Sequence, residues 1–251
     1  MFISKKELIK NLSLIPLLVT SISCGQWYSK YGIKDDKELN SFRAVPKLMK
    51  ALKSGNCYDG MRASGVLVSV GEQARSAFFD LEHFLKRSEC TLRQRVPAAI
   101  ALGQLGKPAF NILLRALISK NGKIRYLAVV ALGAMKFKEP EVIILLNRKI
   151  ASQDPLDLKY AAKQEAFVSL GKHGEKAYKS VPLLVKLLDE PQWRVLSMDA
   201  LVAIGIPSRM ALDALKSLAE KSTDEDFKNE VMRRYYALMS KTTKSREHQS
   251  K

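Results

Sequence analysis

The sequence has few cysteines, prolines and glycines, the residues on which disulfide-rich folds and turn-rich repetitive chains depend. Its 251 residues include only three cysteines, 9 prolines and 13 glycines. Three cysteines are too few for a disulfide scaffold, and this content of proline and glycine excludes collagen-like and linker-like chains. Hydrophobic residues make up 47% of the chain. That fraction is enough for a packed core and excludes intrinsic disorder as the main state.

Patterns that carry catalysis or bind metals are also missing. The three histidines are scattered, and none has a partner at metal-ligand spacing. The stretch Gly103–Lys107 resembles a phosphate loop only superficially, because Ala101 replaces the first required glycine and Pro108 replaces the Ser or Thr. No Gly-x-Ser-x-Gly motif occurs, and no cysteine has a histidine partner in its sequence context. The sequence therefore predicts no catalytic residue, no metal and no cofactor.

Basic residues predominate in the chain. The sequence has 42 Lys and Arg against 25 Asp and Glu, a net charge of +17 and an isoelectric point near 9.8. Residues 1–23 hold three Lys and one Glu, so the remainder keeps a net charge of +15. This excess favours an acidic partner. An isoelectric point above about nine is also the usual footprint of a nucleic-acid binder.

The N-terminus has the three-part layout of a secretory signal. Three lysines precede the uncharged, mostly apolar run Leu12–Ile22, which ends at Ser23. As a helix this run would span about 17 Å, whereas the hydrocarbon core of a membrane is about 30 Å thick. The run is therefore too short for an ordinary membrane span. Residues 1–23 are predicted to be a cleaved signal peptide.

A cysteine directly after a small residue, here Ser23 and Cys24, resembles the lipobox of bacterial lipoproteins. The resemblance implies that Cys24 carries the lipid and that residues 24–34 form a lipid-anchored tether. It also implies export to the cell envelope, with a membrane anchor on the periplasmic side or at the outer membrane. Ser21 departs from the family pattern, which prefers an aliphatic residue there. Ordinary cleavage nearby and a buried helix with an incidental cysteine are the alternatives.

The rest of the chain repeats one pattern. Ala98–Gly106 (AAIALGQLG) matches Glu165–Gly174 (EAFVSLGKHG) in kind, and looser copies stand at Ala128–Met135 and Met198–Gly205. A basic residue precedes each copy, namely Arg95, Arg125, Lys163 and Arg194. After each glycine turn comes a Leu-rich run whose apolar residues recur three and four apart, which predicts a helix. The pattern therefore predicts antiparallel helix pairs: a first helix with the basic residue and a second, Leu-rich helix.

Pairs with an early Arg, an Ala-Leu-Gly ending and a Pro-x-Leu-x-x-Leu-Leu second helix resemble HEAT repeats. The resemblance implies an all-α fold over residues 35–240, a right-handed α-solenoid of stacked antiparallel helix pairs that serves as a surface for partners. A longer interval between two repeats contains Ser152–Asp157, which is predicted to be an exposed loop. Residues 241–251 have no apolar side chain and are predicted to be a disordered basic tail.

Cys57 and Cys90 remain as an even pair if Cys24 is acylated. They follow equivalent positions of two second helices, Lys50 and His83, by seven residues each and so lie in neighbouring loops. Such a pair can form a disulfide in an oxidising compartment. Two free thiols are the alternative, because a disulfide needs Cα atoms within about 7 Å, whereas packed helices lie about 8 to 10 Å apart.

Aligning the second helices on their Leu-Leu pairs places six basic residues at equivalent positions. This basic column consists of Lys50, His83, Arg115, Arg148, Lys186 and Lys216. Their neighbours are apolar, so the six side chains are predicted to point outward, and by the HEAT resemblance to line a concave face. Such a row would attract an acidic protein segment or an anionic envelope component such as a lipid headgroup. The alternative is structural, because the helix dipole favours a cation near a helix C-terminus by about 0.3 to 1 kcal/mol.

Three hypotheses for function remain. The first is a non-catalytic, membrane-tethered protein-interaction scaffold of the cell envelope. The second is a HEAT-like protein that binds nucleic acid or another polyanion, which the charge alone supports. The third is a HEAT-like enzyme similar to bilin lyases or alkylpurine DNA glycosylases. A glycosylase needs aromatic residues around an Asp-bearing pocket, whereas Trp27 lies in the tether and Trp193 is predicted to pack between repeats.

Overall fold

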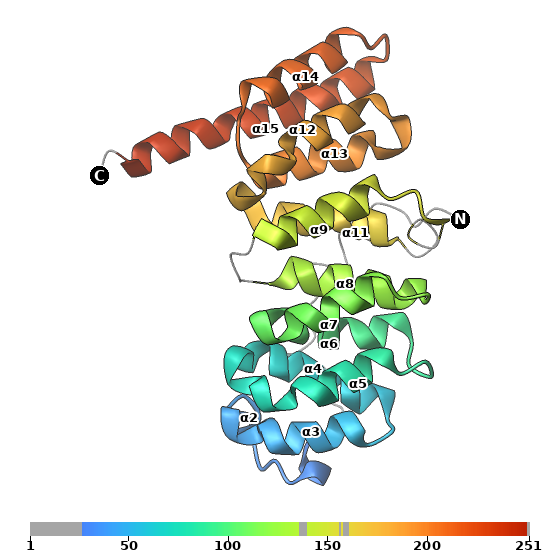
Figure 1. Ribbon diagram of the computed structural model, residues 1–251. Helices are drawn as coiled ribbons and strands as arrows, with labels where there is room; N and C mark the ends of the chain where they lie inside the picture. Colours follow the sequence, from blue (N-terminus) through green and yellow to red (C-terminus); the bar gives the residue numbers. More distant parts are fainter. Residues whose placement is uncertain (1–26, 136–139, 156, 158–160, 250–251) are drawn as a thin grey trace.

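The computed structural model describes residues 27–135, 140–155, 157 and 161–249 (Figure 1). The regular structure of this described part is helical, without a strand, so the all-α prediction is confirmed. The second helices are α3 (Val45–Lys53), α5 (Phe78–Lys86), α7 (Lys107–Leu117), α9 (Pro140–Ala151), α12 (Val181–Lys186) and α14 (Arg209–Glu220). The first helices are α4 (Cys57–Val70), α6 (Leu92–Gln104), α8 (Gly122–Ala134), α11 (Ala162–His173) and α13 (Pro191–Ile204). The chain also forms α2 (Asp36–Leu39), α15 (Glu225–Gln249) and the 3-10 segments Ser29–Tyr31, Phe42–Ala44, Gly71–Ala77, Gly174–Ser180 and Leu187–Asp189.

Local sequence signals account for where these helices begin and end. The Asn56 side chain accepts the backbone N–H groups of Tyr58 and Asp59 at the start of α4, and Thr91 and Gln94 form a capping box at the start of α6. The glycines between a first helix and the next second helix have positive φ: Gly71, Gly106, Gly174 and Gly205. Only glycine adopts this conformation without steric cost, which is why glycine recurs there.

The helices pack in a register one helix away from the one that the sequence predicts. The sequence pairs each first helix with the second helix after its glycine turn. In the structure, each second helix packs instead on the first helix that follows it: α5 on α6, α7 on α8 and α9 on α11. In this register the described part of the chain holds six complete pairs, from α3 with α4 to α14 with α15. The repeat period is the same whether a second helix pairs with the first helix before it or with the one after it. The sequence period therefore could not decide between these two pairings.

The first helices also pack closely on one another, in chain order, from α4 to α13. A Cβ atom added at Gly103 would lie 2.1 Å from the carbonyl oxygen of Ala131, and one at Gly133 would lie 2.3 Å from the Ser169 hydroxyl. No side chain fits at such distances. The recurring Ala-Leu-Gly ending is therefore the point at which neighbouring first helices touch.

Both ends of the helical array differ from the prediction. In the segment assigned to the tether, Tyr28 and Ile33 are buried, and Tyr31 donates a hydrogen bond of 2.8 Å to Asp59 in α4. The packed structure therefore begins before residue 35. At the other end, α15 continues to Gln249, where a disordered tail is predicted from residue 241. No glycine or proline interrupts residues 225–249, so nothing in the backbone ends this helix earlier.

Candidate interaction surface

The basic column occupies the second helices, with one residue on each. Lys50 lies on α3, His83 on α5, Arg115 on α7, Arg148 on α9, Lys186 on α12 and Lys216 on α14. All six side chains are exposed, as predicted. The reason is visible at Lys186, where Leu184, two residues before it, and Leu187, directly after it, are buried and leave the lysine on the outer side of the helix.

Two observations bear on what the column does. Among the described residues, only Lys216 of the six has an ion pair, with Glu220 at 3.9 Å. The other five are available to an external anion. These five also lie in the last turns of their helices, where the helix dipole favours cations. Exposure alone therefore does not separate binding from helix stabilisation, and charge-reversal experiments must do so.

The column lies in the more open of the two helix layers. The first helices touch through glycines, whereas α7 and α9 leave a groove between them. The prediction that the column lines a concave face stays a prediction.

The groove between α7 and α9 has a volume of about 240 Å³. Its lining residues are Phe110, Leu114, Glu141, Ile144, Leu145 and Arg148. Ile144 is 49% exposed. The groove thus joins an apolar floor to one member of the basic column. Sequence analysis missed it, because it depends on the spacing of two helices and not on any one motif.

The repeated basic residues of the first helices point into the structure and hold helix pairs together: Arg95, Arg125 and Lys163 are buried, and Arg194 is half-buried. Arg95 donates to the carbonyl of Leu85 at the end of α5 (3.1 Å), and Arg194 donates to that of Leu188 after α12 (2.7 Å). Lys163 is 1% exposed, and its Nζ lies 4.4 Å from the centre of the Trp193 ring. Burial lowers the pKa of Lys163. Trp193 stacks on Phe167 of α11, so it packs between two neighbouring first helices, α11 and α13.

Arg125 is the centre of a larger network that fixes the end of α7, just beyond Arg115. Its Nη1 donates to the carbonyl of Ser119 (2.7 Å), and its Nε donates to Asp157 (2.6 Å). Lys149 of α9 donates to the other oxygen of Asp157 (2.8 Å). The network therefore ties α8, the end of α7 and α9 together.

Asp157 corrects the prediction that Ser152–Asp157 is an exposed loop. Gln153 to Pro155 are exposed, but Asp157 is 1% exposed because it faces the two cations. Burial raises the pKa of this carboxyl, but hydrogen bonds from Lys149, Ser152 and Arg125 outweigh that effect and hold the pKa below its usual value. An acidic residue inside the longest repeat interval was the only sequence signal for this role.

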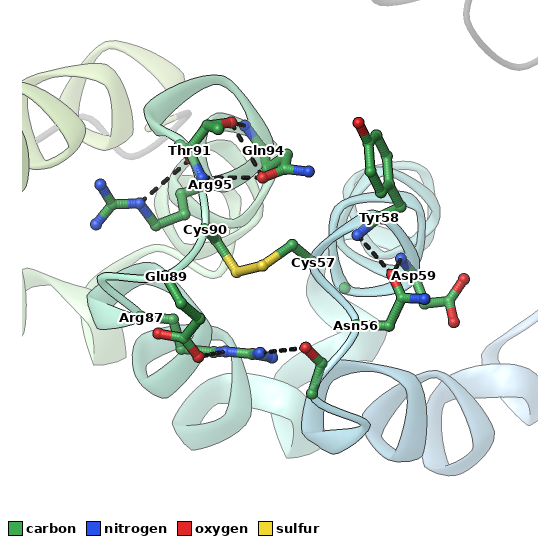
Figure 2. Close-up of a disulfide and its surroundings, with 12 residues drawn as sticks. Asn56, Cys57, Tyr58, Asp59, Arg87, Glu89, Cys90, Thr91, Gln94 and Arg95 are labelled. Atoms are coloured by element: carbon green, nitrogen blue, oxygen red, sulfur yellow. Dashed lines mark hydrogen bonds and ion pairs between the residues drawn. A yellow bond between two sulfur atoms is a disulfide. The ribbon is translucent and has the colours of Figure 1, made fainter.

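The loops before α4 and α6 are joined covalently (Figure 2). Cys57, the first residue of α4, forms a disulfide with Cys90, and their Cα atoms are 5.4 Å apart. The structure thus contains the pairing that the sequence left open. Beside it, Arg87 donates to the carbonyl of Gly55 (2.6 Å) and pairs with Glu89 (2.6 Å). At the position in α4 that carries Arg or Lys in the other first helices stands Gly60, packed against Phe84.

The remaining sequence predictions meet the structure only in part. The proposed signal peptide and Cys24 lie outside the described residues. Within the described part, no helix is long and apolar enough to cross a membrane. The same part holds no group of three or more His, Cys, Asp and Glu residues that could bind a metal ion. No protein-family model matches the chain, and no curated protein matches it.

Proposed function

We propose that this protein is a non-catalytic interaction scaffold, an exported α-solenoid of the HEAT-repeat kind that binds an acidic partner through its second helices. The observation that carries the proposal is the basic column of six exposed residues, one on each second helix: five are Lys or Arg, and one is His83. Among the described residues, only Lys216 of the six has an ion pair. A row of like charges raises the local concentration of anions and steers an acidic partner to this layer. The chain-order packing of helix pairs supports the solenoid.

Charge reversal tests the column directly. Replacing Arg115, Arg148 and Lys186 together by Glu should leave a folded protein that no longer recovers its partner in a pull-down from cell envelopes. The matched control is a triple Lys→Glu variant at exposed lysines outside the column, Lys37, Lys123 and Lys221, which changes the net charge equally. Equal recovery by both variants and the wild type would end the proposal.

The place of this scaffold in the cell envelope rests on Cys24 and on the disulfide. Disulfides persist in oxidising compartments, and Cys57 and Cys90 are positioned for one. Stable anchoring needs two acyl chains or an equivalent second signal. Replacing Cys24 by Ala should therefore release the protein from the membrane fraction and change its mobility on a gel. Unchanged fractionation and mobility would remove the lipid anchor from the proposal.

The net charge of +15 beyond residue 23 supports a second candidate, a polyanion binder. A protein that neutralises phosphates releases counterions, so its affinity for nucleic acid falls steeply with salt concentration. A gel-shift series with duplex DNA and RNA at increasing salt separates the candidates. The measured quantity is the slope of the logarithm of the binding constant against the logarithm of the salt concentration. The scaffold predicts a slope near zero, and a slope of several units would favour the polyanion binder.

A further inference from the structure

We propose that the groove between α7 and α9 binds one apolar side chain of an acidic peptide segment, whose carboxylates pair with Arg148 and Arg115. This inference rests on the proposed function and names the kind of partner that the basic column receives. The proposed occupant of the groove is a protein segment, not a lipid or a nucleic acid.

The size of the groove sets what can enter it. A cavity of about 150 Å³ is known to hold benzene, and pockets for whole drug-sized molecules range from about 300 to 1,000 Å³. The groove, at about 240 Å³, lies between these limits. It has room for one aromatic or large aliphatic side chain and not for a whole cofactor or a row of bases.

The floor of the groove favours such a side chain. Phe110 and Leu114 contribute from α7, and Ile144 and Leu145 contribute from α9. Ile144 is 49% exposed. Covering this surface removes apolar area from water, which favours association. An inserted side chain would contact both helices at once, as the buried anchor residues of protein interfaces do.

The charges at the groove determine which peptide fits. Arg148 lines the groove, and Arg115 follows Leu114, another lining residue, on α7. Neither arginine has an ion pair among the described residues. The nearby cations Arg125 and Lys149 are occupied by Asp157. Among the described residues, Arg148 at the groove and Arg115 on α7 therefore remain for carboxylates of a partner.

Glu141 gives the groove a direction. It lines the groove seven residues before Arg148 on the same helix, a separation of about 10 Å along the axis. A carboxylate near Glu141 would be repelled, whereas one near Arg148 would be attracted. The acidic residues of the partner must therefore lie on the Arg148 side of the inserted side chain.

The groove lies where the second helices pack loosely on one another. At the two ends, α3 packs directly on α5, and α12 packs directly on α14. In the middle, α7 and α9 contact α8 and α11 more than they contact each other. Partner selectivity would then come from the middle of the column, while the outer cations add attraction of longer range.

Fluorescence anisotropy with the full chain tests the proposal. The probes are a labelled peptide with a single Phe followed by a run of Asp, and a matched peptide with Ala in place of Phe. The Phe peptide should bind about tenfold more tightly or better, because a buried aromatic side chain adds to the charge attraction. Ile144→Asn should remove most of this advantage, and Arg148→Glu should weaken binding of both peptides.

Matched controls lie outside the groove. Met210, which is 52% exposed on α14, serves as the apolar control in Met210→Asn, and Lys186→Glu serves as the charge control. Met210→Asn should bind both peptides as the wild type does, and Lys186→Glu should weaken both peptides equally.

Three outcomes would overturn the inference. Equal binding of the Phe and Ala peptides would show that charge alone acts. Loss of binding in Lys186→Glu but not in Ile144→Asn would refute the groove while leaving the column and the proposed function intact. Binding to phosphatidylcholine vesicles containing phosphatidylglycerol that Ile144→Asn abolishes, without binding of the Phe peptide, would assign the groove to a membrane surface.

Discussion

The two helix layers of this molecule use their residues differently. The first helices carry the close contacts: α8 is buried at every residue from Leu127 to Gly133, and Gly103 admits no side chain. The second helices bury one face and present cations and apolar residues on the other, with Ile144 and Arg148 side by side in one groove. On the proposed function, the first helices supply most of the cohesion and the second helices supply recognition. Substitutions should therefore affect stability in one layer and binding in the other.

The largest effect on stability is expected at Asp157. Replacing Asp157 by Asn leaves Arg125 and Lys149 facing an uncharged group, and breaking a buried pair from one side costs about 3 to 5 kcal/mol. Urea unfolding measures this loss. Asp154→Asn is the matched control, because Asp154 also pairs with Arg125 but is 46% exposed, and its effect should stay below about 1 kcal/mol. Equal losses in the two variants would contradict the assigned network.

The disulfide should contribute nearly as much. Cys57 and Cys90 are separated by 33 residues in the sequence, and closing such a loop restricts the unfolded chain by about 3 to 4 kcal/mol on the chain-entropy model. The double variant Cys57→Ser with Cys90→Ser should lose this amount in urea unfolding. Wild-type protein under reducing conditions should behave like the double variant. Oxidised and reduced protein of identical stability would show that the link is absent.

A smaller loss is expected where the first helices touch. Gly103→Ala places a Cβ against the backbone of Ala131, and overpacking of this kind costs about 1 to 3 kcal/mol. Gly65→Ala in α4 is the opposite case, because its Cβ would meet no atom within 4 Å. That variant should gain about 0.5 to 1 kcal/mol, since alanine restricts the unfolded chain and favours helix. A neutral Gly103→Ala would refute the close packing of this layer.

Acid should weaken the network that joins α8, the end of α7 and α9 through Asp157. The folded state lowers the pKa of this carboxyl, so its contribution to stability is complete above the unfolded pKa of about 3.9 and is lost as the pH falls through the folded pKa. The wild type and Asp157→Asn should therefore differ most near neutral pH and converge in acid. If the difference in unfolding free energy between the two proteins grew as the pH falls, a lowered pKa of Asp157 in the folded state would be contradicted.

The smallest stability effect belongs to the second layer. Arg115→Glu and Lys186→Glu should each change the unfolding free energy by at most about 1 kcal/mol, the scale of the helix-dipole contribution. Thermal or urea unfolding of each variant checks this. A loss of several kcal/mol would mean that the column is part of the structural core and that its exposure has another explanation.

The sequence predicted the helices better than their arrangement. The run Val142–Ile150 lies within α9, and the outward direction of Arg148 followed from its apolar neighbours. The pairing register could not be predicted, because a period does not say which neighbour a helix packs on. Asp157 lies 32 residues from Arg125, and no local pattern connects two residues so far apart. The groove escaped prediction for the same reason, since it depends on the spacing of α7 and α9.

The central claim is that partners bind the second helices and not the first. Photo-cross-linking in living cells tests it, with a photoreactive amino acid placed either at Ile144, which is 49% exposed on α9, or at Val195, which is 38% exposed on α13. The account predicts a discrete cross-linked partner from position 144 and none from position 195. A partner captured from position 195 alone would contradict it.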